Sequence, residues 1–175
     1  MSAALIGLGS NLGDREAWFR SALDRLDGHP RIDVRAVSPL YETAPVGGPS
    51  GQGMFLNACA VLETTLDPGV LLRLMLDIER DSGRIRTVKD APRTLDLDLL
   101  LYGDCVIDEP GLSVPHPAMR ERPFVMVPAA AVSGEWRHPV VGRTLEDLAG
   151  VHDDADGIVL HTVVGWWRGA TESAG

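Results

Sequence analysis

The strongest candidate for chemistry is the segment Arg93-Thr94-Leu95-Asp96-Leu97-Asp98, in which two aspartates are separated by one leucine. Side chains of a β-strand alternate between its faces, so this spacing places Asp96 and Asp98 on one face and the leucines on the other. Two neighbouring carboxylates repel unless a cation lies between them, and magnesium is commonly held by one or two carboxylates together with substrate phosphates. The segment therefore favours a magnesium site. A solvent-facing strand edge with two aspartates is the alternative that these residues leave open.

Four cationic side chains lie in or just before this segment, at Arg84, Arg86, Lys89 and Arg93. The chain carries a net charge of −9 and Lys89 is its only lysine, so positive charge is concentrated here. Phosphoryl-type transfer needs cations that neutralise a polyphosphate, and arginine can bind phosphate through two N–H groups. The stretch favours a polyphosphate site beside the metal, with a solvated basic loop as the other interpretation.

Familiar nucleotide-binding and hydrolase motifs are absent from the sequence. GxxxxGK[ST], HExxH and GxSxG do not occur. The glycines of residues 7–13 resemble a dinucleotide-binding fingerprint, but the third comes one position late, so we expect a strand-to-helix turn there.

Three further side chains could contribute to a site. His116 lies between two prolines that keep the backbone extended, so its imidazole could be presented from a loop, although a surface histidine is the more common interpretation. Phe55 and Asn57 follow a Gly/Pro-rich loop, residues 46–53, which could cover a site. On one strand face they offer a ring for stacking and an amide that donates and accepts. A core phenylalanine and a capping asparagine are the alternatives.

The elements that must position these residues follow the order β-α-β-β-α-β. Strands are expected at 3–9, 31–45, 54–65 and 93–103, with helices at 14–26 and from Pro68 to about Gly83. This order is typical of a ferredoxin-like α+β sandwich, with helices on one face of an antiparallel sheet. Trp18, Ala22, Leu23 and Leu26 are the expected inner face of the first helix, and Val70, Leu71, Leu74 and Ile78 that of the second, with Met75 a further candidate.

Residues beyond this core are expected to add short helices near 118–132 and 144–149 and a last strand near 158–164. We expect one domain over residues 1–165 and a frayed tail over residues 166–175.

Composition indicates an ordinary globular protein. The 175 residues are 45% hydrophobic and 23% charged, which suits one hydrophobic core. The net charge of −9 argues against nucleic acid or an anionic membrane as a partner. The two cysteines form no metal-binding motif and are expected to be free in a reducing compartment. Because no signal peptide and no run of about 20 apolar residues is evident, we expect a cytoplasmic protein.

Five segments together resemble a known family. They are GSNLGD (9–14), YETAP (41–45), FLNA (55–58), the RIR and KDAPRTLDLDLLLYG stretch (84–103) and VPHPAMRERPF (114–124). In this order, over roughly residues 3–132, they are similar to the 6-hydroxymethyl-7,8-dihydropterin pyrophosphokinases, and the KxAPRTLDLDLL block is highly specific. The resemblance implies a ferredoxin-like fold and transfer of pyrophosphate from ATP to a pterin hydroxymethyl group in folate biosynthesis, releasing AMP. It also implies two Mg²⁺ ions and a monomer.

The resemblance assigns roles to individual residues. Asp96 and Asp98 would bind magnesium, and Arg84 and Arg93 would steady the triphosphate, so these four form the catalytic set. The ATP site would comprise Leu72, Glu79, Arg86, Lys89, Leu99, Ser113, His116 and Arg122. The pterin would be held by Thr43, Ala44, Val46, Phe55, Asn57 and Phe124, with Phe55 and Phe124 on either side of the ring.

Two departures from the family pattern affect the loop before Asp96. The loop from Arg86 to Arg93 is one residue short, and Asp90 stands where the family has a tryptophan. We expect intact chemistry with altered loop closure. Two alternatives remain: a ferredoxin-like module that senses a pterin or nucleotide without turnover, and an enzyme that phosphorylates another heterocyclic alcohol. A sensor has no need for two metal ligands.

Overall fold

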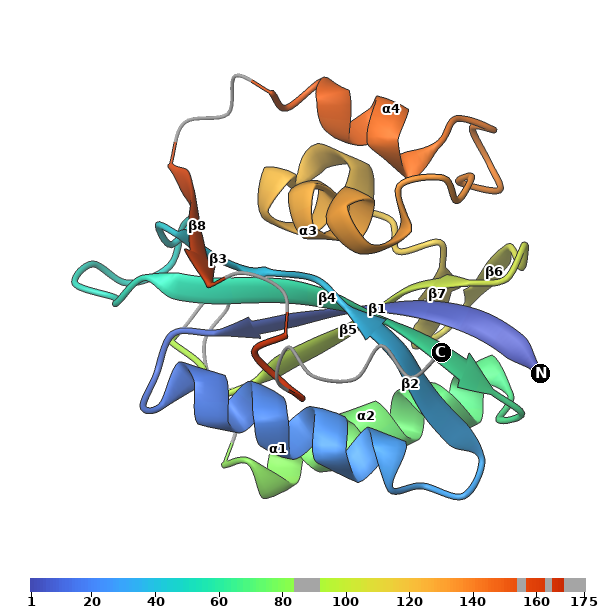
Figure 1. Ribbon diagram of the computed structural model, residues 1–175, viewed down its shortest axis with the longest axis horizontal. Helices are drawn as coiled ribbons and strands as arrows, with labels where there is room; N and C mark the ends of the chain where they lie inside the picture. The colour runs from blue at the N-terminus through green and yellow to red at the C-terminus, as the bar shows by residue number, and fades with distance from the viewer. Residues whose placement is uncertain (84–91, 154–156, 163–164, 169–175) are drawn as a thin grey trace.

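A computed structural model describes residues 1–83, 92–153, 157–162 and 165–168, and its main feature is a twisted antiparallel sheet (Figure 1). Six strands of the described residues form it. In spatial order they are β5 (Asp96–Tyr102), β1 (Ser2–Ser10), β4 (Phe55–Thr64), β3 (Leu40–Thr43) and β8 (Ile158–Thr162), while β2 (Ile32–Val37) also pairs with β4. The long β1 and β4 lie at the centre, so the other strands are positioned against them.

The first part of the chain confirms the predicted ferredoxin-like core. Helices α1 (Arg15–Asp27) and α2 (Pro68–Asp81) lie together on one face of the sheet (Figure 1). Asp14 caps α1 by accepting from the Ala17 N–H at 3.1 Å, and Pro68 begins α2, where its missing N–H costs no helical hydrogen bond. The predicted helical boundaries therefore agree with local capping.

The strand predicted over residues 31–45 is divided into β2 and β3 at Ser38-Pro39. Pro39 has no N–H for a sheet hydrogen bond. The Ser38 hydroxyl instead accepts from the Cys59 N–H at 2.9 Å, and the Ser38 N–H donates to the Cys59 carbonyl at 2.8 Å. Both segments thus stay paired with β4 despite the break.

The elements between β5 and β8 lie beside the edge strand β5 or on the opposite face of the sheet, with Val114 packed on the side of α1 and α2 and Met119 on the other side. They are a hairpin of β6 (Ile107–Glu109) and β7 (Leu112–Val114), the 3₁₀ turn η1 (Met119–Glu121), and helices α3 (Pro123–Ser133) and α4 (Leu145–Gly150). Figure 1 shows α3 and α4 across the sheet from α1 and α2. The hairpin was not predicted from the sequence.

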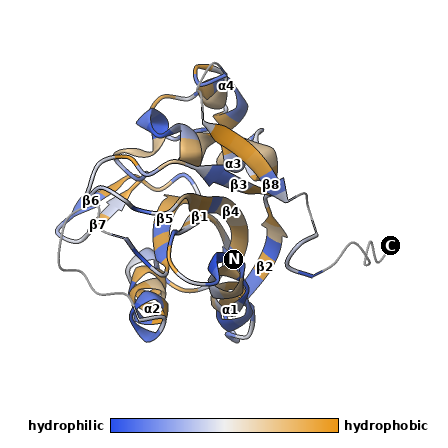
Figure 2. Ribbon diagram, turned by 90° about the vertical axis from the view of Figure 1, so that its left-hand side faces the viewer, coloured by the Kyte–Doolittle hydropathy of each residue, from blue (hydrophilic) through white to orange (hydrophobic). Residues whose placement is uncertain are grey.

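Two hydrophobic clusters fill the space on either side of the sheet. One, with Ile6, Phe19, Met75 and Leu97, lies under α1 and α2. The other, with Leu100, lies between the sheet and α3. Figure 2 shows the apolar colouring of β1 and β4 at the centre and the polar outer sides of α1 and α2. The sheet is therefore covered on both faces.

The predicted inner faces of the two helices are largely confirmed, with one difference in each. Phe19 is fully buried in α1, whereas the predicted Trp18 is only partly buried. In α2, Met75 is fully buried and the predicted Val70 is 37% exposed. Trp18 still packs against the cluster under α1 and α2, so Val70 is the one predicted residue that points away from it.

The end of the described chain packs on the sheet and on α1. Strand β8 corresponds to the last strand predicted near residues 158–164, and it pairs antiparallel with β3. Trp166, which the sequence assigns to a frayed tail, is 8% exposed, donates from Nε1 to the Ser38 carbonyl at 2.8 Å, and lies 6.1 Å from the Phe19 ring. Residues 166–168 therefore belong to the packed structure, because a buried indole is stabilised by its contacts and its satisfied N–H.

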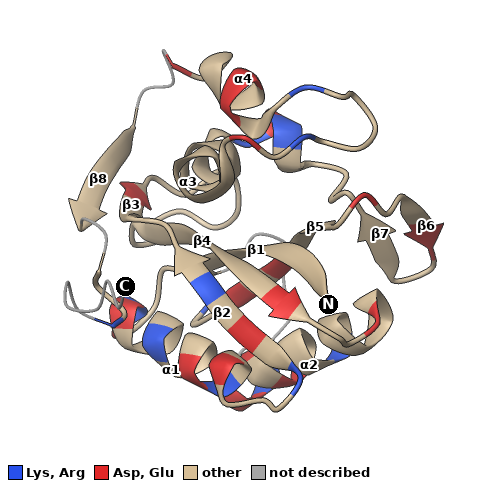
Figure 3. Ribbon diagram, turned by 45° about the vertical axis from the view of Figure 1, so that its right-hand side comes forward, with Lys and Arg blue, Asp and Glu red and all other residues tan. Residues whose placement is uncertain are grey.

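Charged side chains are spread over the outer surface. Figure 3 shows acidic and basic residues interspersed along the outer sides of α1 and α2. No helix in the described ranges is both long and apolar enough to cross a membrane.

Candidate active site at one end of strand β5

The two aspartates lie on the face of β5 that α3 covers only in part. Leu95 and Leu97 belong to the cluster under α1 and α2, whereas Leu100 belongs to the cluster under α3. By alternation, Asp96 and Asp98 share the face of Leu100. Both carboxylates are partly exposed, with side-chain exposures of 22% and 30%. The predicted arrangement of carboxylates on one face and leucines in the core is confirmed.

Each aspartate lies opposite a glycine of β1. The register pairs Asp96 with Gly9 and Asp98 with Gly7. A Cβ added to Gly9 would lie 3.8 Å from Asp96 Cβ, and one added to Gly7 would lie 3.9 Å from Asp98 Cβ. The missing side chains leave space beside both carboxylates. These two glycines lie within β1, and the predicted turn begins only after Ser10.

The outer edge of β5 is capped by two groups rather than by another strand of the described residues. The Leu97 N–H donates to Glu79 Oε1 at 2.8 Å, and the His116 N–H donates to the Leu100 carbonyl at 2.9 Å. Glu79, predicted to contact ATP, is 2% exposed. Its carboxylate is directed at the strand backbone, so it fixes α2 against β5.

Arg93 precedes the aspartates and is held by the turn after β1. Its N–H donates to Asn11 Oδ1 at 2.8 Å, and its carbonyl accepts from the Asn11 N–H at 3.1 Å. Its guanidinium contacts Asp96 Oδ2 at 3.2 Å and lies 5.6 Å from the centre of the Phe55 ring. Asn11 also donates to Gln52 Oε1 at 3.1 Å, which joins the Gly/Pro loop to the same point.

A cavity of about 530 Å³ opens between the sheet and the start of α3. We call it the aromatic cavity, after Phe55 and Phe124 in its wall. All six residues predicted to hold a pterin line it, as does Asp96. Its lining residues are Gly9, Thr43, Ala44, Pro45, Val46, Phe55, Asn57, Arg93, Asp96, Glu121, Arg122, Pro123, Phe124, Gly157 and Ile158.

A buried polar pair gives this cavity directional hydrogen-bonding groups. Asn57 is 5% exposed and Thr43 is 6% exposed. Asn57 Nδ2 donates to Thr43 Oγ1 at 2.7 Å, which fixes the orientation of the amide. A flat heterocycle with donors and acceptors on its edge therefore suits this cavity, because rings can stack on it and the amide can read the edge.

A second cavity of about 330 Å³ lies between α2, β5 and the β6–β7 hairpin, and we call it the aliphatic cavity. Leu72, Leu99, Ser113 and His116, all predicted to contact ATP, line it together with Asp98. The two aspartates thus stand one at each cavity. A metal held by both would lie between two ligands placed in the two cavities.

His116 faces the carboxylate that the aliphatic cavity contains. Its Nδ1 accepts from the Ala118 N–H at 3.2 Å, and its Nε2 lies 3.9 Å from Asp98 Oδ1. Burial, reinforced by Arg122 and opposed by Asp96, lowers the pKa of His116 below its usual 6.5. The neutral ring therefore presents its Nε2–H toward the space beside Asp98, where it could donate to a phosphate or hydroxyl.

The remaining predicted site residues either lie in another place than expected or fall outside the described residues. Arg122 lines the aromatic cavity, with its guanidinium 5.9 Å from the Phe124 ring, and is not part of the lining of the aliphatic one. Arg84, Arg86 and Lys89 lie outside the described residues.

Several residues of the site were not identified from the sequence. Gly7 and Gly9 open the space beside the carboxylates, and Asn11 joins two loops to Arg93. The sequence does carry a signal for the glycines, because glycine is disfavoured within strands and often marks a close approach of a ligand. Gly157 and Ile158 reach the aromatic cavity from the far end of the chain, and no local pattern indicated this.

The donor set fits a magnesium ion that is bound partly by substrate. Within the described ranges no group of three or more His, Cys, Asp or Glu side chains could hold a metal. Asp96 and Asp98 supply two hard oxygen donors on one face, and magnesium commonly completes its coordination with waters and phosphate oxygens.

Comparisons with known proteins agree with this geometry. A family model described as 7,8-dihydro-6-hydroxymethylpterin-pyrophosphokinase matches residues 5–134. The 2-amino-4-hydroxy-6-hydroxymethyldihydropteridine pyrophosphokinase of Bacillus subtilis is 46% identical over 129 residues, which cover 74% of this chain and 77% of that protein. The enzyme of the same name from Pseudomonas aeruginosa is 43% identical over 143 residues, covering 82% and 87%.

A solved structure shares the fold at low identity. The crystal structure of Plasmodium falciparum HPPK-DHPS superposes with a TM-score of 0.69 at 15% sequence identity, covering 87% of this chain and 45% of that one. This chain thus spans less than half of that protein, and the likeness supports the fold alone. With the family model matching residues 5–134, the chain belongs to the 7,8-dihydro-6-hydroxymethylpterin-pyrophosphokinase family.

Proposed function

We propose that this chain transfers pyrophosphate from ATP to the hydroxyl of 6-hydroxymethyl-7,8-dihydropterin, forming AMP, as a step of folate biosynthesis. The observation that carries the proposal is the position of Asp96 and Asp98, each lining one of two adjacent cavities of different character. Pyrophosphoryl transfer needs that arrangement, because acceptor and donor must approach one another at the point where charge is neutralised.

The pterin occupies the aromatic cavity in this proposal. Phe55 and Phe124 lie on either side of its ring, and Asn57, oriented by Thr43, hydrogen-bonds to its edge. The hydroxymethyl group is then directed toward Asp96. Ala44 and Val46 contribute to the same wall from the segment after β3.

ATP occupies the aliphatic cavity, with its triphosphate near Asp98. Leu72 and Leu99 provide apolar contact, while Ser113 and neutral His116 provide hydrogen-bonding groups. Three further phosphate contacts remain predictions because they lie outside the described residues: Arg84, Arg86 and Lys89. Because Arg122 lines the other cavity, we place its cationic group at the pterin side of the phosphates.

Asp96 and Asp98 would hold the magnesium, for which we keep the expected number of two ions. The bound metal supplies neutralisation of phosphate charge and lowers the pKa of a coordinated hydroxyl. Arg93, already paired with Asp96 at 3.2 Å, lies where it can stabilise charge on the transferred group.

The reaction balances without covalent participation by the protein. The pterin hydroxyl oxygen forms a bond to the β-phosphorus of ATP, the bond from that phosphorus to the oxygen bridging it to the α-phosphorus breaks, and AMP leaves with that oxygen. The hydroxyl proton passes to solvent or to a carboxylate, for which Asp98 is the candidate. Placing two bound substrates in line can itself lower the barrier by about 7–11 kcal/mol, so a weak base suffices.

Three general expectations are kept as part of the proposal. We keep one domain, which the packing of Trp166 extends beyond the expected end at residue 165, because β8 belongs to the same sheet as β1. A monomer is also kept as an expectation. The acidic net charge gives no support for a nucleic acid partner. Free Cys59 and Cys105 fit a reducing compartment, so the cytoplasm is the proposed location.

The first test is AMP release from ATP and magnesium, with and without the pterin. AMP that requires both the pterin and magnesium is the expected result, and EDTA should abolish it. Pterin binding without AMP release would contradict the proposal and support a non-catalytic sensor, which membership of a pyrophosphokinase family does not favour. AMP release with a different heterocyclic alcohol alone would contradict the substrate.

A further inference from the structure

Strand β8 lies outside the residues that the family model matches, yet it reaches the substrate cavity. The matched region ends at residue 134, whereas β8 spans Ile158–Thr162. Its register places Ile158 opposite Thr43, the residue that orients Asn57. A segment distant in sequence is thereby joined to the strand that carries a pterin contact.

The two faces of β8 have different surroundings. Ile158 shares the face of its partner Thr43 and lines the aromatic cavity. Val159 is opposite Glu42, points to the other face and is 60% exposed. His161 lies at the irregularity in the β3–β8 register, and its contacts with Glu16 and Glu42 place it toward α1. One face of β8 therefore completes the cavity wall, and the other can be anchored.

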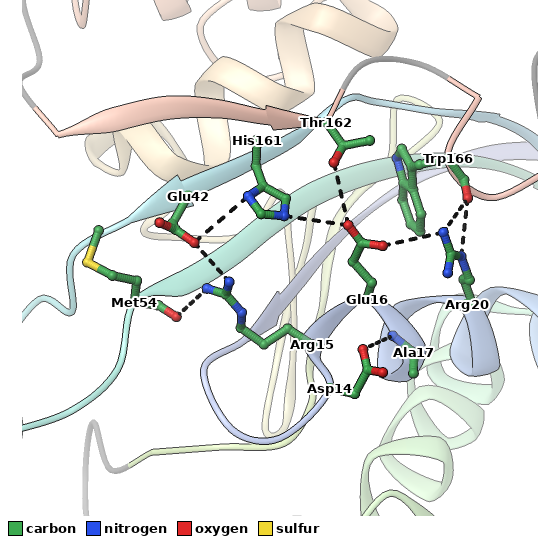
Figure 4. Close-up of polar contacts among 10 residues, drawn as sticks. All are labelled: Asp14, Arg15, Glu16, Ala17, Arg20, Glu42, Met54, His161, Thr162 and Trp166. Atoms are coloured by element: carbon green, nitrogen blue, oxygen red, sulfur yellow. Dashed lines mark hydrogen bonds and ion pairs between the residues drawn. The ribbon is translucent and has the colours of Figure 1, made fainter.

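A polar cluster on that second face joins β8, β3 and α1 (Figure 4). We call Arg15, Glu16, Glu42 and His161 the anchoring cluster. His161 Nε2 lies 3.5 Å from Glu16 Oε1, and its Nδ1 lies 3.9 Å from Glu42 Oε2. Arg15 Nη2 contacts Glu42 Oε2 at 2.8 Å.

Helix α1 makes further contacts with the same end of the chain. Thr162 Oγ1 donates to Glu16 Oε1 at 3.4 Å, and Glu16 Oε2 pairs with Arg20 at 3.3 Å. Arg20 donates through Nε and Nη2 to the Trp166 carbonyl, at 3.2 and 3.0 Å. Glu16 thus connects the end of β8 with the segment that follows it.

On these grounds we propose that Ile158 is a specificity-determining residue of the pterin site and that Glu16, through the anchoring cluster, positions it. This inference rests on the proposed function, since it assigns the occupant of the aromatic cavity. The aliphatic side chain of Ile158 in the cavity wall limits which substituted heterocycles fit there. It also excludes water from the bound heterocycle.

The first experiment compares Ile158→Ala with its neighbour Val159→Ala, which removes a similar side chain from the opposite face. Ile158→Ala should raise the KM and Kd for the pterin by about tenfold or more, because one missing methylene in an apolar pocket changes binding by about 10- to 200-fold. Its KM for ATP and its kcat should stay within about twofold of the parent, as should all constants of Val159→Ala. Ile158→Val should give a smaller change in the same direction.

The second experiment tests the positioning role of Glu16. Glu16→Ala should raise the KM for the pterin by about two- to threefold, in keeping with partly exposed ion pairs, with kcat unchanged. Glu16→Gln should restore most of the affinity, because its amide oxygen still accepts from Thr162. In the double variant with Ile158→Ala, the two effects should be less than multiplicative if Glu16 acts through Ile158.

Three outcomes overturn the inference: an unchanged pterin KM and Kd in Ile158→Ala, an equal rise in the KM for ATP, or fully multiplicative effects in the double variant. Pterin Kd values measured by calorimetry without ATP separate this inference from the proposed function. If the parent protein releases no AMP, the proposed function fails, while the calorimetric comparison of Ile158→Ala with Val159→Ala still decides the role of Ile158.

Discussion

The two faces of the sheet are built from the same strands and do different work. Under α1 and α2 the face is continuously apolar, with Ile6, Phe19 and Leu97 in one cluster. On the other face α3 covers an apolar part that includes Leu5 and Leu100, and beyond it Asp96 and Asp98 are partly exposed. Along this face of β5 the side chains change from aspartate to leucine where the cover of α3 begins, so the core ends and the site starts within one strand.

The largest effect expected from this comparison is on the site face. Asp98→Ala should reduce AMP release by on the order of 10³-fold, because a lost metal ligand removes several kcal/mol of transition-state stabilisation. The melting temperature should be unchanged or slightly higher, since two neighbouring carboxylates repel. Steady-state assays and a thermal melt check both. Activity within tenfold of the parent would contradict the metal assignment.

The core face should show the opposite behaviour. Leu23→Ala, at a fully buried position of α1, should lower the free energy of unfolding by about 2–5 kcal/mol through lost transfer energy and a residual cavity. The activity of the folded protein at low temperature should stay near that of the parent. Urea titration and assays on the folded fraction provide the test, and a large loss of kcat without loss of stability would break the division between the faces.

The buried pair of Asn57 and Thr43 tests whether a residue of the site face acts on binding rather than on stability. Thr43→Val removes the acceptor that orients the Asn57 amide and should weaken pterin binding by up to about tenfold, because a misoriented amide loses about one net hydrogen bond to the ligand. Thr64→Val is the matched control. Its hydroxyl donates to the Arg31 carbonyl at 2.8 Å elsewhere on β4, so stability should fall while pterin affinity is kept. Calorimetry distinguishes the two variants, and equal affinities would contradict the role of Thr43.

The smallest effect concerns His138, beyond α3. Burial, reinforced by Arg120, lowers the pKa of His138 below its usual 6.5. Above about pH 6.5 His138 is neutral in both the folded and the unfolded chain, and as the pH falls below this value the unfolded chain binds the proton more readily, so the free energy of unfolding decreases. In His138→Gln, the decrease in unfolding free energy between about pH 7 and pH 5 should be smaller. Urea titrations at several pH values measure this. An equal decrease of the unfolding free energy with pH in the parent and the variant would contradict the role of His138.

Local sequence was enough to predict the core elements and the shared face of the two aspartates. Strand alternation placed Asp96 and Asp98 on one face, because that period is local and follows from backbone geometry. Capping by Asp14 and the start of α2 at Pro68 were local for the same reason. The residues predicted to hold a pterin came from the family resemblance, and β3, the segment after it, β4 and α3 bring them together at one cavity.

The tertiary structure alone decided which distant segments complete the site. Asn11 reaches Arg93 and Gln52 because two turns meet at one end of the sheet. Glu79 is directed at the backbone of an edge strand, and Ile158 reaches the cavity because β8 pairs with β3. These contacts depend on which elements pack side by side, and no local period of the chain contains that information. The physical reason is that alternation and capping act within a few residues, whereas the site is assembled by sheet pairing across the whole chain.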